Sequence, residues 1–190
     1  MLLQRARIPV TVVASRCDEE SIHRPAPQLL SLERARCKAL GAMLEPAQLC
    51  GSPAVIGADT VVALGNEVFG KPVDRADARR MLARLSGTTH VVSTGHCCAL
   101  FAPDGSVTTQ VARTAVARVT MRPLTMDEIA AYVDSGESDQ RAGAYAIQEH
   151  GDRFVAERDG SWDTVVGLNL AMVARLYREC TDRPLPGYTP

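Results

Sequence analysis

Long hydrophobic runs are absent from this 190-residue sequence, and so is an excess of charge of either sign. No apolar segment approaches the roughly 20 residues that cross a bilayer, and the first residues lack the basic-then-apolar pattern of a signal peptide. Because 21 Lys and Arg balance 22 Asp and Glu, no global positive field attracts nucleic acid or a membrane surface. We therefore expect a cytoplasmic protein that binds neither, and that holds any anionic ligand through a local cluster.

Recognisable zinc and phosphate-loop motifs are lacking as well. The six cysteines and four histidines show no paired spacing of a zinc site, and no G-x-x-x-x-G-K-S/T run is present. The scattered cysteines predict reduced thiols rather than disulfides, because disulfide frameworks belong to short exported chains. Zinc catalysis and a Walker-type nucleotide site are therefore not expected.

What the sequence does contain is enough apolar material for a sizeable core, at 46% of its residues. The length suits one domain over residues 1–180, with room for two lobes, followed by a Pro-rich tail at 181–190. We therefore expect a single domain.

The spacing of apolar residues predicts alternating helices and strands. Helices are expected over 1–7, 29–44, 75–87, 125–135 and 168–180. Strands are expected over 10–14, 54–64, 67–70, 90–101, 107–119, 143–147, 154–156 and 164–166. Asp74 is placed as an N-cap, and Thr125 with Glu128 forms a capping box. These elements predict an α/β fold with an elongated, central mixed sheet flanked by helices.

Asp59 is the one acid in the apolar run over residues 54–64. A carboxylate there is costly to bury unpaired, so Asp59 must hold a cation, accept backbone hydrogen bonds or border a cleft. Gly70 and Pro72 fix the backbone around Lys71, which suits a phosphate contact, although most loop lysines are simply solvated. Taken alone, Lys38 indicates only a solvated helix face, and Glu19 indicates only an acidic residue in a loop.

A series of short segments, taken together, resembles the Maf family of nucleotide pyrophosphatases. The segments are Asp18-Glu19, 35–39 (ARCKA), 57–62 (GADTVV), 70–72 (GKP), 142–148 (AGAYAIQ) and 165–168 (VVGL). Such a series is highly specific, and the resemblance runs from Met1 to about Leu176. It implies a two-lobed protein that cleaves a nucleoside triphosphate into the monophosphate and pyrophosphate.

The resemblance also implies roles for individual residues. Asp59 would be the catalytic carboxylate that orients or deprotonates the attacking water and, with Glu19, would hold Mg²⁺ or Mn²⁺. Lys38 and Lys71 would contact the phosphates. Thr60 and Gln148 would select the base, as in the branch of the family that acts on dTTP and UTP, and an amide offers the donor and acceptor needed. A cleft between the lobes would be lined by Glu19, Lys38, Asp59, Lys71 and Gln148. A homodimer is implied by the resemblance alone.

The resemblance departs from the family at the N-terminus. The family begins with a strand and a Ser-x-Ser-Pro-Arg-Arg loop, whereas Met1-Leu2-Leu3 aligns with the helix after that loop, which predicts a start codon upstream. This difference keeps a second hypothesis open, a non-catalytic nucleotide-binding regulator of septum formation. A purine-directed house-cleaning enzyme is a third, which the surroundings of Gln148 disfavour.

Overall fold

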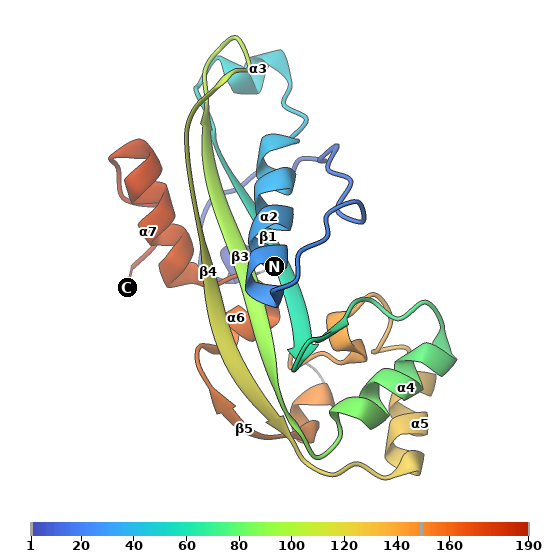
Figure 1. Cartoon of the computed structure of the whole chain (residues 1–190). Helices are drawn as coiled ribbons and strands as arrows, with labels where there is room; N and C mark the ends of the chain where they lie inside the picture. Colours follow the sequence, from blue (N-terminus) through green and yellow to red (C-terminus); the bar gives the residue numbers. More distant parts are fainter. Residues whose placement is uncertain (1, 149, 190) are drawn as a thin grey trace. The chain divides into compact units, whose positions relative to one another are not determined.

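The computed structural model describes residues 2–148 and 150–189 (Figure 1). Its larger helices are α2 (Pro27–Leu40), α4 (Arg75–Leu85), α5 (Met126–Asp134) and α7 (Leu170–Thr181). The shorter helices are α1 (Leu2–Arg5), α3 (Pro46–Leu49), α6 (Trp162–Val166), η1 (Ala142–Ala144) and η2 (His150–Phe154). The strands are β1 (Ala54–Leu64), β2 (Glu67–Phe69), β3 (Thr89–Phe101), β4 (Val107–Met121) and β5 (Val155–Asp159).

The five strands form one sheet in the order β2-β1-β3-β4-β5. Val62 pairs with Phe69 in the antiparallel β1–β2 ladder, and Arg118 pairs with Asp159 in the antiparallel β4–β5 ladder. A short turn at residues 102–106 joins β3 to β4 as a hairpin. The expected α/β class, a central sheet flanked by helices, is confirmed, but the sheet is antiparallel instead of mixed as expected.

The residues group into two compact units. Unit 1 comprises Met1–Asp59, Thr94–Ala115 and Gly167–Pro190, and unit 2 comprises Thr60–Ser93 and Val116–Val166. The long strands β1, β3 and β4 each contribute residues to both units. Unit 1 takes its part of the sheet from these three strands, and unit 2 adds β2 and β5 to them.

Unit 2 has a single large apolar core, in which α4 and α5 pack on the sheet. Its largest fully buried members include Tyr132, Phe154 and Leu82. Asp74 caps α4 as expected, because its Oδ1 accepts a hydrogen bond from Asp77 N at 2.7 Å. The predicted helix beginning at that cap is confirmed.

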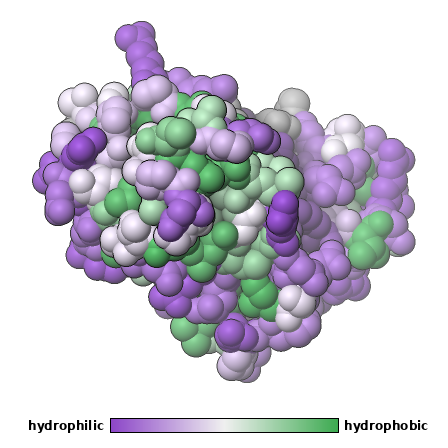
Figure 2. Space-filling view, turned by 90° about the horizontal axis from the view of Figure 1, so that it is seen from above, coloured by the Kyte–Doolittle hydropathy of each residue, from purple (hydrophilic) through white to green (hydrophobic). Residues whose placement is uncertain are grey.

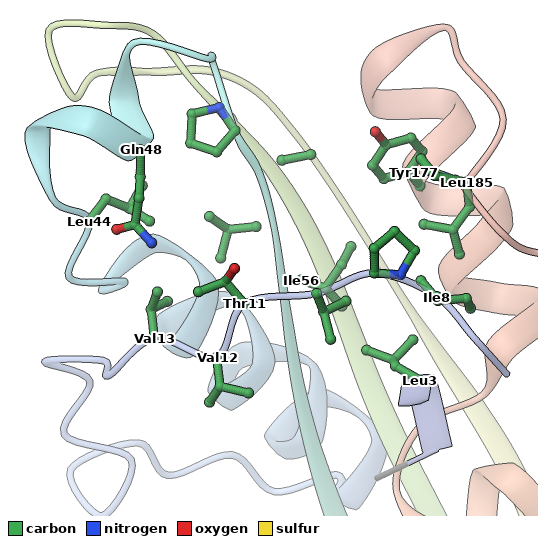
Figure 3. A pocket seen from close by; sticks show the side chains of 16 residues that line it. Leu3, Ile8, Thr11, Val12, Val13, Leu44, Gln48, Ile56, Tyr177 and Leu185 are labelled. Atoms are coloured by element: carbon green, nitrogen blue, oxygen red, sulfur yellow. The ribbon is translucent and has the colours of Figure 1, made fainter. Parts of the chain in front are cut away.

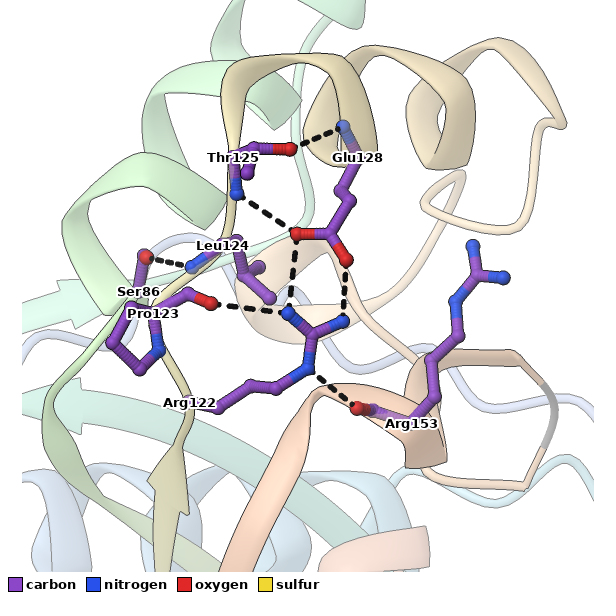
Figure 4. Close-up of polar contacts among 7 residues, drawn as sticks. All are labelled: Ser86, Arg122, Pro123, Leu124, Thr125, Glu128 and Arg153. Atoms are coloured by element: carbon purple, nitrogen blue, oxygen red, sulfur yellow. Dashed lines mark hydrogen bonds and ion pairs between the residues drawn. The ribbon is translucent and has the colours of Figure 1, made fainter.

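A polar cluster fastens the start of α5 to the strands below it (Figure 4). The predicted capping box is present, since Glu128 N donates to Thr125 Oγ1 at 3.2 Å and Thr125 N donates to Glu128 Oε2 at 2.9 Å. Arg122 binds the same carboxylate with both terminal nitrogens and donates through Nε to Arg153 O. The hydrogen bonds from Arg122 lower the pKa of Glu128 to about 2. Through Arg122, this cluster joins α5 to the end of β4 and to η2.

In unit 1, helix α2 lies unusually close to the sheet, and two glycines permit it. A Cβ at Gly57 of β1 would lie 2.4 Å from Ala35 O, and one at Gly95 of β3 would lie 2.2 Å from Ser31 O. Ala35 and Ala39, on the facing side of the helix, are fully buried. Small residues on both surfaces therefore fix where α2 crosses the strands.

The two ends of the described chain pack together in unit 1. Leu3 of α1 and Ile8 form a buried cluster with Val173 of α7 and Leu185. Asn169 caps α7 through a hydrogen bond from Met172 N at 2.8 Å. Residues far apart in the sequence thus share one small core.

Three expected strands are wrong. Residues 10–14 form no strand: residues 10–13 all line a cavity, and most of the segment is exposed, with Val12 71% exposed. Residues 143–147 begin as the turn η1, where Gly143 and Ala144 both have positive φ. Residues 164–166 end helix α6. Short apolar runs fit several conformations, and here tertiary contacts decide among them.

The expectation that all cysteines are reduced is also wrong. Cys17 and Cys37 form a disulfide with a Cα–Cα distance of 5.3 Å, while Cys50, Cys97, Cys98 and Cys180 are free thiols. The chain folds back so that Ser15 bridges Ala42, and this brings together two cysteines that lie 20 residues apart. No local spacing in the sequence signals that pairing.

The surface is mainly hydrophilic, and on the face in Figure 2 apolar side chains gather in small groups between polar ones. Exposed large apolar residues include Val12, Val73 and Met126. Within the described part of the chain, every helix is too short or too polar to span a bilayer.

Candidate functional site

A lysine and two carboxylates meet in unit 1. Lys38 Nζ lies 2.5 Å from Glu19 Oε2 and 2.6 Å from Asp59 Oδ1. These three residues come from three separate segments: the loop before α2, α2 itself and β1. The structure therefore brings together three of the six residues that the resemblance singles out.

The packing of α2 on β1 explains why Lys38 reaches Asp59. Gly57 lies two residues before Asp59 on the same strand, and its missing side chain lets Ala35 and Ala39 approach the strand. Lys38 stands in the last turn of α2, and its ammonium bridges to Asp59 from there. A strand with a larger residue at position 57 would hold the helix, and with it the ammonium, farther away.

Burial and charge oppose each other at this cluster. Burial raises the pKa of Asp59 above its usual value, although the hydrogen bond and charge of Lys38 act to lower it. Burial alone would lower the pKa of Lys38, but its hydrogen bonds to Asp59 and Glu19 outweigh that effect and raise it. At neutral pH the lysine is therefore charged, and Asp59 is a stronger base than an exposed carboxylate.

The two carboxylate oxygens of Asp59 have different surroundings. The Asp59 side chain is 9% exposed, and its Oδ2 is buried without a hydrogen-bond partner among the described residues. A buried carboxylate oxygen without a partner is costly, so this atom is suited to a further ligand. Water, a cation or both would satisfy it.

A polar cavity of about 360 Å³ borders the cluster. Glu19 and Lys38 line it, together with residues 13–15, Cys17, Ala42 and residues 55–58, which end directly before Asp59. A second cavity, of about 460 Å³, shares Val13, Val55 and Ile56 with the first and is mainly apolar (Figure 3). The charged groups therefore lie on the wall of the first cavity only.

Lys71 and Gln148 belong to unit 2. Both are exposed and stand on loops, and the two loops are joined where Gly143 N donates to Gly70 O at 3.1 Å. The segment leading to Gln148 is buried from Gly143 to Ile147. Unit 2 thus offers an ammonium and an amide on a fixed backbone.

Two buried aromatic contacts hold that backbone, and sequence reasoning gave them no role. Ala146 N donates to Tyr132 Oη at 3.0 Å, and His90 Nε2 lies 2.7 Å from Tyr145 Oη. Burial lowers the pKa of His90 to about 4, so His90 is neutral near pH 7. The sequence showed Tyr145 only as a member of the 142–148 segment, because its partner His90 is distant in sequence.

Thr60 follows Asp59 directly on β1 and is half-buried. Glu19, Lys38 and Asp59 belong to unit 1, whereas Thr60, Lys71 and Gln148 belong to unit 2. The expected cleft lined by both sets stays a prediction, as do the individual roles.

The donor set fits a divalent cation in part. Among the described residues, no group of three or more His, Cys, Asp and Glu side chains is arranged to hold a metal ion. Glu19 and Asp59, however, converge on one cationic group, and the unpartnered Oδ2 of Asp59 is a hard oxygen ligand. Mg²⁺ is commonly bound by one or two carboxylates plus waters and substrate phosphates, so these two residues suit it.

The fold and the site together define the class of this protein. It is an α/β protein in which a lysine and two carboxylates lie beside a polar cavity. The chain belongs to the Maf family, because residues 1–180 match the Maf-like protein family. It is 44% identical to the dTTP/UTP pyrophosphatase of Moorella thermoacetica over 178 residues, covering 92% of this chain and 86% of that protein.

Further relatives carry related names. The chain is 44% identical to a dTTP/UTP pyrophosphatase of an Anaeromyxobacter species over 172 residues, covering 90% of this chain and 80% of the relative. It is 43% identical over 175 residues to a nucleoside triphosphate pyrophosphatase of Xylella fastidiosa, covering 92% of this chain and 89% of that protein.

Proposed function

We propose that this chain is a metal-dependent nucleoside triphosphate pyrophosphatase that converts dTTP and UTP to the monophosphate and pyrophosphate. The observation that carries the proposal is the contact of Lys38 with Glu19 and Asp59 beside a polar cavity. The relatives named dTTP/UTP pyrophosphatase support the substrate choice. The alternative, a non-catalytic regulator of septum formation, is not favoured, because these relatives are named as enzymes.

The proposed chemistry uses the unequal surroundings of the two Asp59 oxygens. Lys38 holds Oδ1 in place, so Oδ2 is left to orient a water in line with the bond between the α and β phosphates and to take its proton. The raised pKa of Asp59 favours that proton transfer. Attack by the water breaks the α–β bridge and releases pyrophosphate as the leaving group.

Cationic groups neutralise the charge that develops on the phosphate oxygens. Lys38 and Lys71 supply two of them, and each is a flexible point charge suited to phosphate. Glu19 and Asp59 would hold Mg²⁺ or Mn²⁺, which when bound supplies further charge neutralisation. Thr60 and Gln148 are assigned to the base, where the amide of Gln148 offers a donor and an acceptor.

The test is pyrophosphate release from dTTP, UTP, CTP and GTP with Mg²⁺, using Asp59→Asn and, as a matched control, Asp104→Asn in the exposed turn between β3 and β4. We expect turnover of dTTP and UTP, a loss of roughly 10²- to 10⁴-fold for the Asp59 variant and little change for the control. Absence of pyrophosphate from all four nucleotides would overturn the proposal, and nucleotide binding without turnover would favour the regulator.

A cytoplasmic location and a homodimer complete the proposal. The location rests on the sequence composition, and the homodimer rests on the family resemblance. Cell fractionation and sedimentation velocity would test them independently of the assay.

A further inference from the structure

The Cys17–Cys37 disulfide stands directly beside the residues assigned to the reaction. Cys17 precedes Glu19 by two residues, and Cys37 is the immediate neighbour of Lys38. Both cysteines are half-buried, and Cys17 lines the same polar cavity as Glu19 and Lys38. The covalent bond therefore joins the loop that carries one charged group to the helix that carries the other.

The chain before Cys17 is held by several hydrogen bonds of its own. Arg16 N donates to Gly41 O at 2.9 Å, Ser15 Oγ donates to Lys38 O at 3.0 Å, and Met43 N donates to Ala14 O at 2.8 Å. These bonds attach residues 14–16 to the end of α2 whether or not the disulfide is present. Breaking the disulfide would thus leave the preceding segment in place.

The loop after Cys17 is held differently. Ser21 Oγ donates to Asp18 O at 2.9 Å, and Ile22 N donates to Glu19 O at 3.4 Å, so these contacts shape the loop without joining it to α2. The Glu19–Lys38 ion pair does join them, but both side chains are about 30% exposed. Partly exposed ion pairs hold weakly. In the proposed reaction Lys38 also contacts the substrate phosphates while it holds Asp59, so its ammonium is shared and its hold on Glu19 weakens further.

We propose that the Cys17–Cys37 disulfide is a positioning element of the site, and that its reduction by a dithiol weakens metal binding by Glu19. This inference rests on the proposed function. The crosslink limits the conformations of the Glu19 loop, so Glu19 keeps its place when the ammonium of Lys38 is shared with the phosphates. Cysteine residues that are only half-buried are accessible to a small dithiol.

The chemical step is ordinary thiol–disulfide exchange. A thiolate of the dithiol attacks one sulfur of the pair and forms a mixed disulfide, and the other cysteine leaves as a thiolate that takes a proton. The second thiol of the reagent then closes a cyclic disulfide and releases the remaining cysteine. Two electrons pass from the reagent to the protein, and Cys17 and Cys37 both end as thiols.

The experiment compares the oxidised protein with the same protein treated with dithiothreitol. Pyrophosphate release from dTTP is measured over a range of Mg²⁺ concentrations, and hydrogen exchange of residues 18–24 is measured without nucleotide. Reduction is expected to raise the Mg²⁺ concentration for half-maximal activity by roughly tenfold, to change the maximal rate less, and to speed exchange in residues 18–24.

Serine variants provide the controls. The Cys17→Ser and Cys37→Ser variants should behave like the reduced protein and ignore dithiothreitol, whereas Cys50→Ser, which changes an exposed free thiol, should keep the response. The proposal is overturned if both redox states need the same Mg²⁺ concentration or exchange equally fast, or if the oxidised protein titrates with six free thiols. If every form is inactive, the proposed function has failed, and hydrogen exchange alone decides whether the disulfide tethers the loop.

Discussion

The two units present their candidate residues in different ways. Unit 1 divides the apolar residues that the structure describes among three small clusters and places an ammonium in contact with two carboxylates. Unit 2 has one large core and presents Lys71 and Gln148 as exposed side chains on loops. Mutual charges hold the groups of unit 1, whereas buried backbone contacts hold the loops of unit 2. Substitutions in the two units should therefore fail in different ways.

Among the substitutions that compare the two units, replacing Lys38 with Met should give the largest effect, because it removes the ammonium from both carboxylates. We expect kcat/KM for dTTP to fall by roughly 10²-fold. The pKa of Asp59 should rise further, since Lys38 acts to lower it, so Asp59 is protonated at a higher pH and the acidic limb of activity moves upward. The measurement is the pH profile of kcat/KM.

Arg36→Met is the matched control for charge loss on α2, because Arg36 pairs with Glu33 instead of the site. The acidic limb of its pH profile of kcat/KM should lie at the same pH as in the unsubstituted protein. An unchanged limb in the Lys38 variant as well would show that Asp59 does not set the acidic limb.

Replacing Gly57 with Ala should disrupt unit 1 through packing rather than charge. The new Cβ would meet Ala35 O at 2.4 Å and Ala39 N at 2.6 Å, so α2 must move away from β1. We expect a loss of about 1–3 kcal/mol in the free energy of unfolding, together with lower activity. Urea unfolding measures it, and Gly51→Ala, whose Cβ would meet only Gln48 O at 3.7 Å, is the control. Equal stability of both variants would contradict the close approach.

Replacing Tyr132 with Phe should weaken unit 2 without touching any charged group. The buried Ala146 N loses its acceptor, which costs about 1–3 kcal/mol of stability. Because Ala146 lies two residues before Gln148, KM for dTTP should rise as well. Urea unfolding and KM are compared with those of Tyr188→Phe in unit 1, where a smaller change is expected. A full loss of kcat instead would place Tyr132 in the chemistry.

Replacing Gln148 with Leu should have the smallest effect and should alter selectivity alone. Loss of one donor and one acceptor should reduce the preference for UTP over CTP by roughly three- to tenfold. The ratio of kcat/KM for the two nucleotides measures this, with Gln110→Leu on β4 as the control. An unchanged ratio would mean that Gln148 does not recognise the base.

The sequence predicted most elements of the fold because local signals determine them. The run of β-branched residues before Gly65 defined β1 to its last residue, and Asp74 and Thr125 marked the starts of α4 and α5. Residues 10–14 and 164–166 carried no comparable stop signals, so their conformations followed from distant contacts.

The candidate site was predictable only as a set of residues. The family motifs named Glu19, Lys38 and Asp59, but nothing local indicated that one ammonium would contact both carboxylates. That contact depends on the approach of α2 to Gly57, which is a property of packing. The Cys17–Cys37 disulfide was missed for the same reason, since the fold rather than the spacing brings the two cysteines together.

The meeting of the two chain ends in unit 1 has a consequence for synthesis on the ribosome. Every residue of unit 2 has been translated once Val166 is added, whereas unit 1 still lacks α7 and Leu185 at that moment. Leu3 and Ile8, made before unit 2, must wait for Val173 and Leu185 before they are buried. The middle of the chain can therefore fold before its beginning, and the lysine–carboxylate site belongs to the part that is completed last.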